Sequence, residues 1–160
     1  MSTPVPRPAP PRVKQLCLDS SVVCTVLLQE RGWQAIMNAL ARPEVDGILP
    51  GPALTEAISV ARHKGNRSTP THIAQALATM GLQVEHPTDD DLVRAAELIE
   101  ISDDNPGPPP PHSGRHATLS LGDALILAVT ERLGCMVLTR DGYWKWMVDE
   151  GHLRVQVAIP

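Results

Sequence analysis

The sequence predicts an α/β fold, a three-layer α/β/α sandwich with a central, mostly parallel sheet. Short apolar segments alternate along the chain with stretches that have the spacing of amphipathic helices. This alternation favours right-handed crossovers and a parallel sheet covered on both faces. The chain has 160 residues, of which 42% are hydrophobic, which suits one domain with an ordinary core.

The first half of the chain carries two apolar strands and the helices around them. Residues 13–18 are predicted as the first strand, and residues 48 and 49 as the end of a short second strand. Pro52 suits the first turn of a helix, and Gly81 suits the end of one. Helices are expected over residues 22–29, 33–41, 52–62 and 73–80, with a further candidate strand over residues 82–85.

The second half repeats the alternation. Thr88 and three aspartates open a helix over residues 92–101, and the acidic run itself is interpreted as a solvated helix face. Ser120 precedes a helix of strong apolar periodicity, which Gly134 ends. The expected elements are a helix over residues 121–133, a core strand over 136–138, a short helix over 143–149 and a last strand over 153–159.

Two proline-rich segments are expected to be irregular. Residues 1–12 are predicted as a disordered tail, and residues 102–117 as a surface loop, because consecutive prolines cannot join a helix or a sheet interior. Residues 13–160 then form the single predicted domain.

Composition restricts the function. The net charge of −4 argues against nonspecific binding of nucleic acid through the overall field, so contacts with phosphates must be local. No secretory signal or membrane span is visible, and the 3 cysteines show neither redox-motif nor zinc-ligand spacing. A cytoplasmic protein with buried thiols and no membrane contact is the expectation.

Four acidic residues are predicted at the carboxyl edge of the sheet, where working sites of parallel sheets lie. They are Asp19, Glu56, Asp123 and Asp141, each at the end of a strand or the start of a helix. Each has a structural explanation when taken singly, as a helix cap, a macrodipole partner or a turn residue. Together they would repel one another unless they share protons or hold a cation.

Four segments around these acids resemble, in order and spacing, the acidic motifs of PIN-domain nucleases. The resemblance covers nearly the whole chain from residue 13 onward and is closest to the VapC-type toxins of bacterial toxin–antitoxin pairs. The segments are QLCLDSSVV at residues 15–23, LTEAI at 54–58, LSLGDA at 119–124 and VLTRD at 137–141.

The resemblance implies a magnesium-dependent endoribonuclease, with manganese as a possible substitute. Asp19, Asp123 and Asp141 would hold the metal, and Glu56 would orient or deprotonate the attacking water. Thr139 and one of two serines, Ser20 or Ser21, would brace the acids. Independently, phosphodiester hydrolysis needs an activated water and a cation for the developing charge, and magnesium held by hard oxygens supplies both.

The resemblance also implies three partners: an RNA substrate, an antitoxin protein that places a basic side chain in the acidic pocket, and a second copy of the chain in a homodimer. Local cations that could reach phosphates are Arg62, Lys64, Arg115 and Arg140, although each could equally be a solvated surface charge. The alternative function is a catalytically silent PIN-like module that binds a metal or a partner. A phosphatase or phosphoacceptor is disfavoured, because Asp19 has no second acid beside it.

Overall fold

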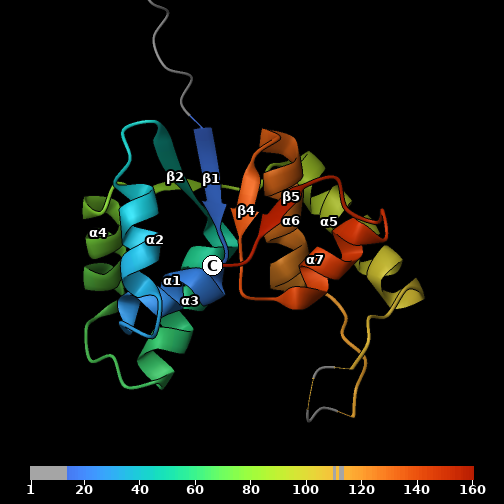
Figure 1. Ribbon diagram of the computed structural model, residues 1–160, viewed down its shortest axis with the longest axis horizontal. Coiled ribbons are helices and arrows are strands. Elements are labelled where there is room, and N and C mark those ends of the chain that lie inside the picture. The colour runs from blue at the N-terminus through green and yellow to red at the C-terminus, as the bar shows by residue number, and fades with distance from the viewer. Residues whose placement is uncertain (1–13, 110, 112–113) are drawn as a thin grey trace, which may run out of the picture.

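Five parallel strands form one central sheet in the order β3-β2-β1-β4-β5 (Figure 1). The structure, a computed structural model, describes residues 14–109, 111 and 114–160, so the predicted tail at residues 1–12 lies outside the described residues. The predicted α/β class with a central parallel sheet is confirmed. The strands are β1 (Lys14–Leu18), β2 (Val45–Pro50), β3 (Gln83–Glu85), β4 (Met136–Leu138) and β5 (Gln156–Ala158).

Helices flank this sheet in two groups. Figure 1 shows α1 to α4 gathered beside the β2 side of the sheet and α5 to α7 beside the β4 and β5 side. Among the described residues, no helix combines the length and the apolarity that a membrane crossing requires. The helices are α1 (Ser20–Leu27), α2 (Trp33–Leu40), α3 (Gly51–His63), α4 (Pro70–Thr79), α5 (Asp89–Asp104), α6 (Leu121–Leu133) and α7 (Gly142–Asp149).

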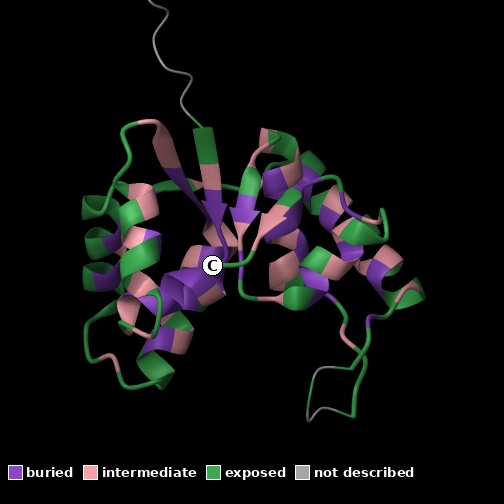
Figure 2. Cartoon of the chain, in the orientation of Figure 1, coloured by how far each residue is buried: buried purple, intermediate pink, exposed green. Residues whose placement is uncertain are grey.

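Both faces of the sheet are covered. Neighbouring residues of a strand point to opposite faces, yet Cys17 and Leu18 of β1 are both buried, as are Ile48 and Leu49 of β2. Figure 2 shows the buried residues, in purple, along the middle of the sheet and on the inner sides of the helices. The carboxyl ends of the central strands are therefore held in place by packing on both faces, and this fixes where the following loops begin.

Some element boundaries differ from those that the sequence predicts. Helix α5 continues to Asp104, so the first residues of the segment predicted as a loop are helical. Ser102 explains the difference, because its side chain is fully buried and accepts a hydrogen bond from Leu119 N at 2.8 Å. The last strand is shorter than expected, since Leu153 and Val155 are buried without joining the sheet.

The interpretation of the acidic run as a solvated face is wrong for Asp91. This residue is 3% exposed and completes a capping box with Thr88, whose backbone N–H donates to Asp91 Oδ2 at 2.8 Å. Arg132 of α6 also donates to Asp91 Oδ2 through Nε at 2.8 Å. Asp91 therefore joins α5 to α6, while its neighbours Asp89 and Asp90 are exposed as expected.

We predict that Asp91→Ala lowers the free energy of unfolding by about 2 kcal/mol, because it removes a helix cap and a partly buried ion pair. Chemical denaturation followed by circular dichroism measures the effect. Asp90→Ala is the matched control, one residue away and exposed, and should change stability by less than about 0.5 kcal/mol. Equal effects of the two substitutions would contradict a structural role for Asp91.

Candidate active site at the carboxyl edge of the sheet

Asp19 stands directly after β1 and caps α1. Its carboxylate is 3% exposed and accepts hydrogen bonds from Ser20 N at 2.6 Å, Ser20 Oγ at 3.3 Å, Ser21 Oγ at 2.6 Å and Thr139 Oγ1 at 2.8 Å. A carboxylate offers about four acceptor positions. These four donors compensate for the burial of the charge, which would otherwise be costly.

Two hydroxyl groups connect Asp19 to the loop that follows β4. Thr139 Oγ1 donates to Asp19 and accepts from Asp141 N at 3.0 Å. Ser21 Oγ donates to the same carboxylate oxygen and accepts from Arg140 N at 3.1 Å. The loop carrying Asp141 is thus held against the end of β1, and both Ser20 and Ser21 contact the acid that the sequence expected one of them to brace.

Asp123 lies in the first turn of α6, where it forms a capping box with Ser120. Its Oδ2 accepts from Ser120 N at 3.0 Å and from Ser120 Oγ at 2.7 Å. Burial raises the pKa of Asp123 to about 6, and the charges of Asp19 and Asp141 add to that rise against the lowering effect of the Ser120 bonds. The cap explains why the residue type suits this position, but the repulsion by two other acids is not a capping effect.

Asp141 caps α7 and accepts from Tyr143 N at 2.8 Å. Burial raises its pKa, and the charge of Asp19 raises it further. Three aspartates from three separate parts of the chain are therefore within electrostatic reach of one another. This is the arrangement that the sequence predicts for the carboxyl edge of the sheet.

Glu56 is exposed on α3, at the margin of this group. Its carboxylate lies beside the first turn of α6, where a Cβ atom on Gly122 would be 3.5 Å from Glu56 Oε2. It also lines a cavity of about 290 Å³ together with Ser20, Ser21, Lys64 and Arg140. Glu56 is thus adjacent to the aspartates, but it is more accessible to solvent than they are.

A fifth acid that the sequence did not single out occupies the same cavity. Glu30 accepts from Lys64 Nζ at 3.0 Å and from Arg140 Nη1 at 3.1 Å, so one carboxylate holds two of the cations expected to reach phosphates. Glu30 lies 34 and 110 residues from these partners, and no local pattern could have revealed the contact. The other two predicted cations are also exposed. Arg62 lies in the last turn of α3, and Arg115 lies in the segment before α6.

Aromatic residues close the site on the side of the proline-rich segment. Trp144 is fully buried and Tyr143 nearly so, and Trp146 stacks on Tyr143 with 5.6 Å between ring centroids. The Tyr143 hydroxyl bonds to Asn105 O at 3.1 Å and to Ser102 Oγ at 2.9 Å. The rings therefore pack against the domain and anchor the start of the loop.

The donor set is suited in its chemistry to a hard divalent cation. Asp123 Oδ1 and Asp141 Oδ2 accept no hydrogen bond from the residues that the structure describes, and magnesium is commonly held by one or two carboxylates while it keeps several waters. All acceptor positions of Asp19 are taken by protein donors, of which Ser20 Oγ is the most distant. In the described residues, no group of three or more His, Cys, Asp or Glu side chains is placed so that it could hold a metal ion.

A family model for the PIN domain matches residues 16–146, which include all four predicted acids. The chain belongs to the PIN domain family. Among curated proteins, no sequence matches.

Solved structures of PIN proteins share the fold. VapC20 of Mycobacterium tuberculosis, described as a sarcin–ricin loop cleaving toxin, is 18% identical, with a TM-score of 0.63 over 88% of this chain and 98% of that one. VapBC2 of Rickettsia felis, bound to a fragment of its promoter DNA, is 10% identical with a TM-score of 0.65 over 91% and 98%. VapBC-1 of nontypeable Haemophilus influenzae is 13% identical with a TM-score of 0.62 over 91% and 97%. At these identities the likeness shows the fold.

We predict that Asp123→Asn raises the melting temperature at pH 7 in the presence of EDTA. The folded state raises the pKa of Asp123 from 3.8 to about 6, so the folded protein binds more protons than the unfolded chain between these values, and stability falls as pH rises through them. The amide removes the repelling charge and keeps an acceptor for Ser120.

The same comparison at pH 3.5 should show almost no gain, because Asp123 is then mostly protonated in both states. Differential scanning calorimetry gives both values. Glu100→Gln, an exposed change in the middle of α5, serves as the control and should be neutral at both pH values. A loss of stability in Asp123→Asn at pH 7 would contradict the repulsion argument.

Proposed function

We propose that this PIN-domain protein is a metal-dependent endoribonuclease and the toxin of a toxin–antitoxin pair. The observation that carries the proposal is the convergence of Asp19, Asp123 and Asp141, from three parts of the chain, where burial and mutual repulsion raise the pKa of Asp123 and Asp141. A fold retains such a destabilising group of acids when the group binds a cation or moves a proton.

Magnesium, or manganese in its place, would supply charge compensation for the phosphate and a more acidic water. Asp123 and Asp141 are the residues with carboxylate oxygens free to hold it, and Asp19 would do so by giving up a hydroxyl donor. Thr139 and Ser21 keep the acids in register, since each connects Asp19 to the backbone of the loop after β4.

Glu56 is assigned the role of orienting the attacking water or accepting its proton. Among the four acids it is the exposed one, and it faces the first turn of α6 where Asp123 stands. A group that must meet both solvent and substrate needs this accessibility, whereas the less exposed aspartates are suited to holding charge.

An antitoxin partner fits the acidic pocket, because a basic side chain would relieve the repulsion among the aspartates. Three of the structurally similar proteins are toxin–antitoxin assemblies: VapBC2, VapBC-1 and the complex from Klebsiella pneumoniae. We include an antitoxin, a homodimer and a cytoplasmic location in the proposal as expectations of the same function.

The proposal predicts that the purified protein cleaves cellular RNA into discrete fragments with magnesium and does not cleave it with EDTA. Asp19→Asn and Asp123→Asn should each lower the cleavage rate by about a hundredfold or more, because each removes a charge from the site that must balance the cation. Glu100→Gln, an exposed change on α5 outside the four predicted acids, is the matched control and should cleave at the wild-type rate.

Two other outcomes would change the assignment. Binding of magnesium that depends on these acids, without any cleavage, would establish the silent binding module instead. Cleavage that persists in both asparagine variants would show that the acids are not the catalytic group, and a thermal melt of each variant excludes unfolding as the cause of any loss.

Glu30 is predicted to restrain RNA binding. Its carboxylate pairs with both Lys64 and Arg140 at the edge of the acidic site. Glu30→Gln should therefore release both side chains and strengthen binding of an RNA oligonucleotide about threefold to tenfold at low salt, measured in EDTA by fluorescence anisotropy. Glu97→Gln, which breaks the pair between Glu97 and Arg94 on another face, is the control. Equal RNA affinities of the two variants would show that Lys64 and Arg140 do not contact the RNA.

A further inference from the structure

Two cysteines, one on β1 and one next to β4, lie in direct contact. Cys17 is near the end of β1, and Cys135 immediately precedes β4. The two strands pair so that Cys17 stands opposite Val137, two residues beyond Cys135, which places the two thiols diagonally on one face of the sheet. Their Sγ atoms are 3.1 Å apart, and all three cysteines of the chain are free thiols.

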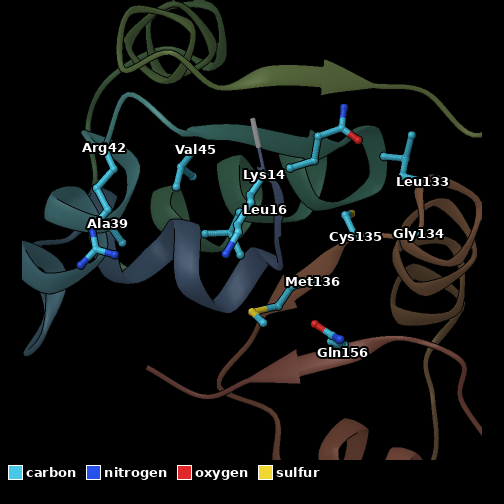
Figure 3. Close-up of a pocket in the computed structure, with 11 residues that line it drawn as sticks. Lys14, Leu16, Ala39, Arg42, Val45, Leu133, Gly134, Cys135, Met136 and Gln156 are labelled. Carbon is cyan, nitrogen blue, oxygen red and sulfur yellow. The ribbon is translucent and has the colours of Figure 1, made fainter. Parts of the chain in front are cut away.

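A cavity of about 650 Å³ opens beside Cys135, at the amino-terminal ends of the strands and away from the acidic loops. Figure 3 shows Lys14, Leu16, Arg42 and Met136 around it together with Cys135. Cys135 is partly exposed, whereas Cys17 is fully buried behind it. A small reagent that enters the cavity therefore meets Cys135 first.

The contact makes the two thiols chemically unequal. A hydrogen bond from Cys17 lowers the pKa of Cys135, while the same contact and burial raise the pKa of Cys17. The cations Lys14 and Arg42 line the same cavity and favour an anion within it. The accessible sulfur is thus the nucleophile of the pair, and the buried sulfur lies where it can react with an oxidised Cys135.

We propose that Cys135 and Cys17 are a peroxide-reactive pair that closes to an intramolecular disulfide between β4 and β1. The Cys135 thiolate attacks one oxygen of hydrogen peroxide, which forms a sulfenic acid and releases hydroxide. The Cys17 sulfur then attacks the Cys135 sulfur, so that the S–S bond forms, the S–O bond breaks and water leaves. In sum, two thiols and one peroxide give one disulfide and two waters.

Cys24 provides an internal control. It is buried like Cys17, but its Sγ contacts the backbone oxygen of Ala57 at 3.7 Å instead of another thiol. Burial raises the pKa of Cys24 to about 11. The third cysteine therefore lacks both the nucleophilic form and the second sulfur that the proposed reaction requires.

The test is peptide mapping by mass spectrometry of the reduced full-length protein after a timed exposure to hydrogen peroxide. We expect a Cys17–Cys135 cross-linked peptide and the loss of two hydrogens from the intact protein. Cys24 should remain a free thiol, detected by alkylation, for about tenfold longer exposure to peroxide than the Cys17–Cys135 pair. In Cys17→Ala, the sulfenic acid on Cys135 should accumulate and be trapped by dimedone. Cys24→Ala should form the disulfide at the wild-type rate.

Three results would overturn the proposal. They are oxidation of Cys24 as fast as Cys135, conversion of wild-type Cys135 to sulfinic acid without a cross-link, and an intermolecular disulfide as the main product. The wild-type measurement decides the proposal even if Cys17→Ala does not fold. Because the readout is covalent mass, failure of the nuclease assay would leave this result unaffected.

Discussion

The hydrogen bonding of one buried carboxylate organises the site. Asp19 directly follows the central strand β1, and its four donors come from the start of α1 and from Thr139 after β4. Without those donors a buried carboxylate at this position would be expensive, and with them the loop that carries Asp141 is drawn to the same point. The position of Asp141 relative to Asp19 therefore depends on the pairing of β1 with β4.

The acids are electrostatically unfavourable to one another, and the fold offsets this elsewhere. The cost is visible in the pKa of Asp123 and of Asp141, which repulsion and burial raise. Ion pairs join α5 to α6, the helix that presents Asp123: Arg94 binds Glu131 at 2.7 Å, and Arg132 binds Asp91. Asp123 thus stands at the start of a helix whose last turn is joined to α5 by ion pairs, so that a strained functional group is carried by a fixed scaffold.

Most elements were predictable because their signals are local. Apolar periodicity and the Ser120 and Gly134 caps define α6 over the predicted residues 121–133, and the short apolar run before Thr139 defines β4. The errors occur where distant contacts override local composition. Ser102 stays helical because it bonds to Leu119 and Tyr143, and Asp91 is buried because Arg132 reaches it from α6.

The sequence by itself determined the fold class, the four acids and their order along the chain, because strand and helix patterns and residue types are properties of short segments. Only the tertiary structure decided which acids meet as a buried or half-buried group, that Glu56 lies at its exposed margin, and that Glu30 holds Lys64 and Arg140. It also brought Cys17 to Cys135. These contacts join residues far apart in the chain, so they follow from strand pairing and helix packing, which no local pattern records.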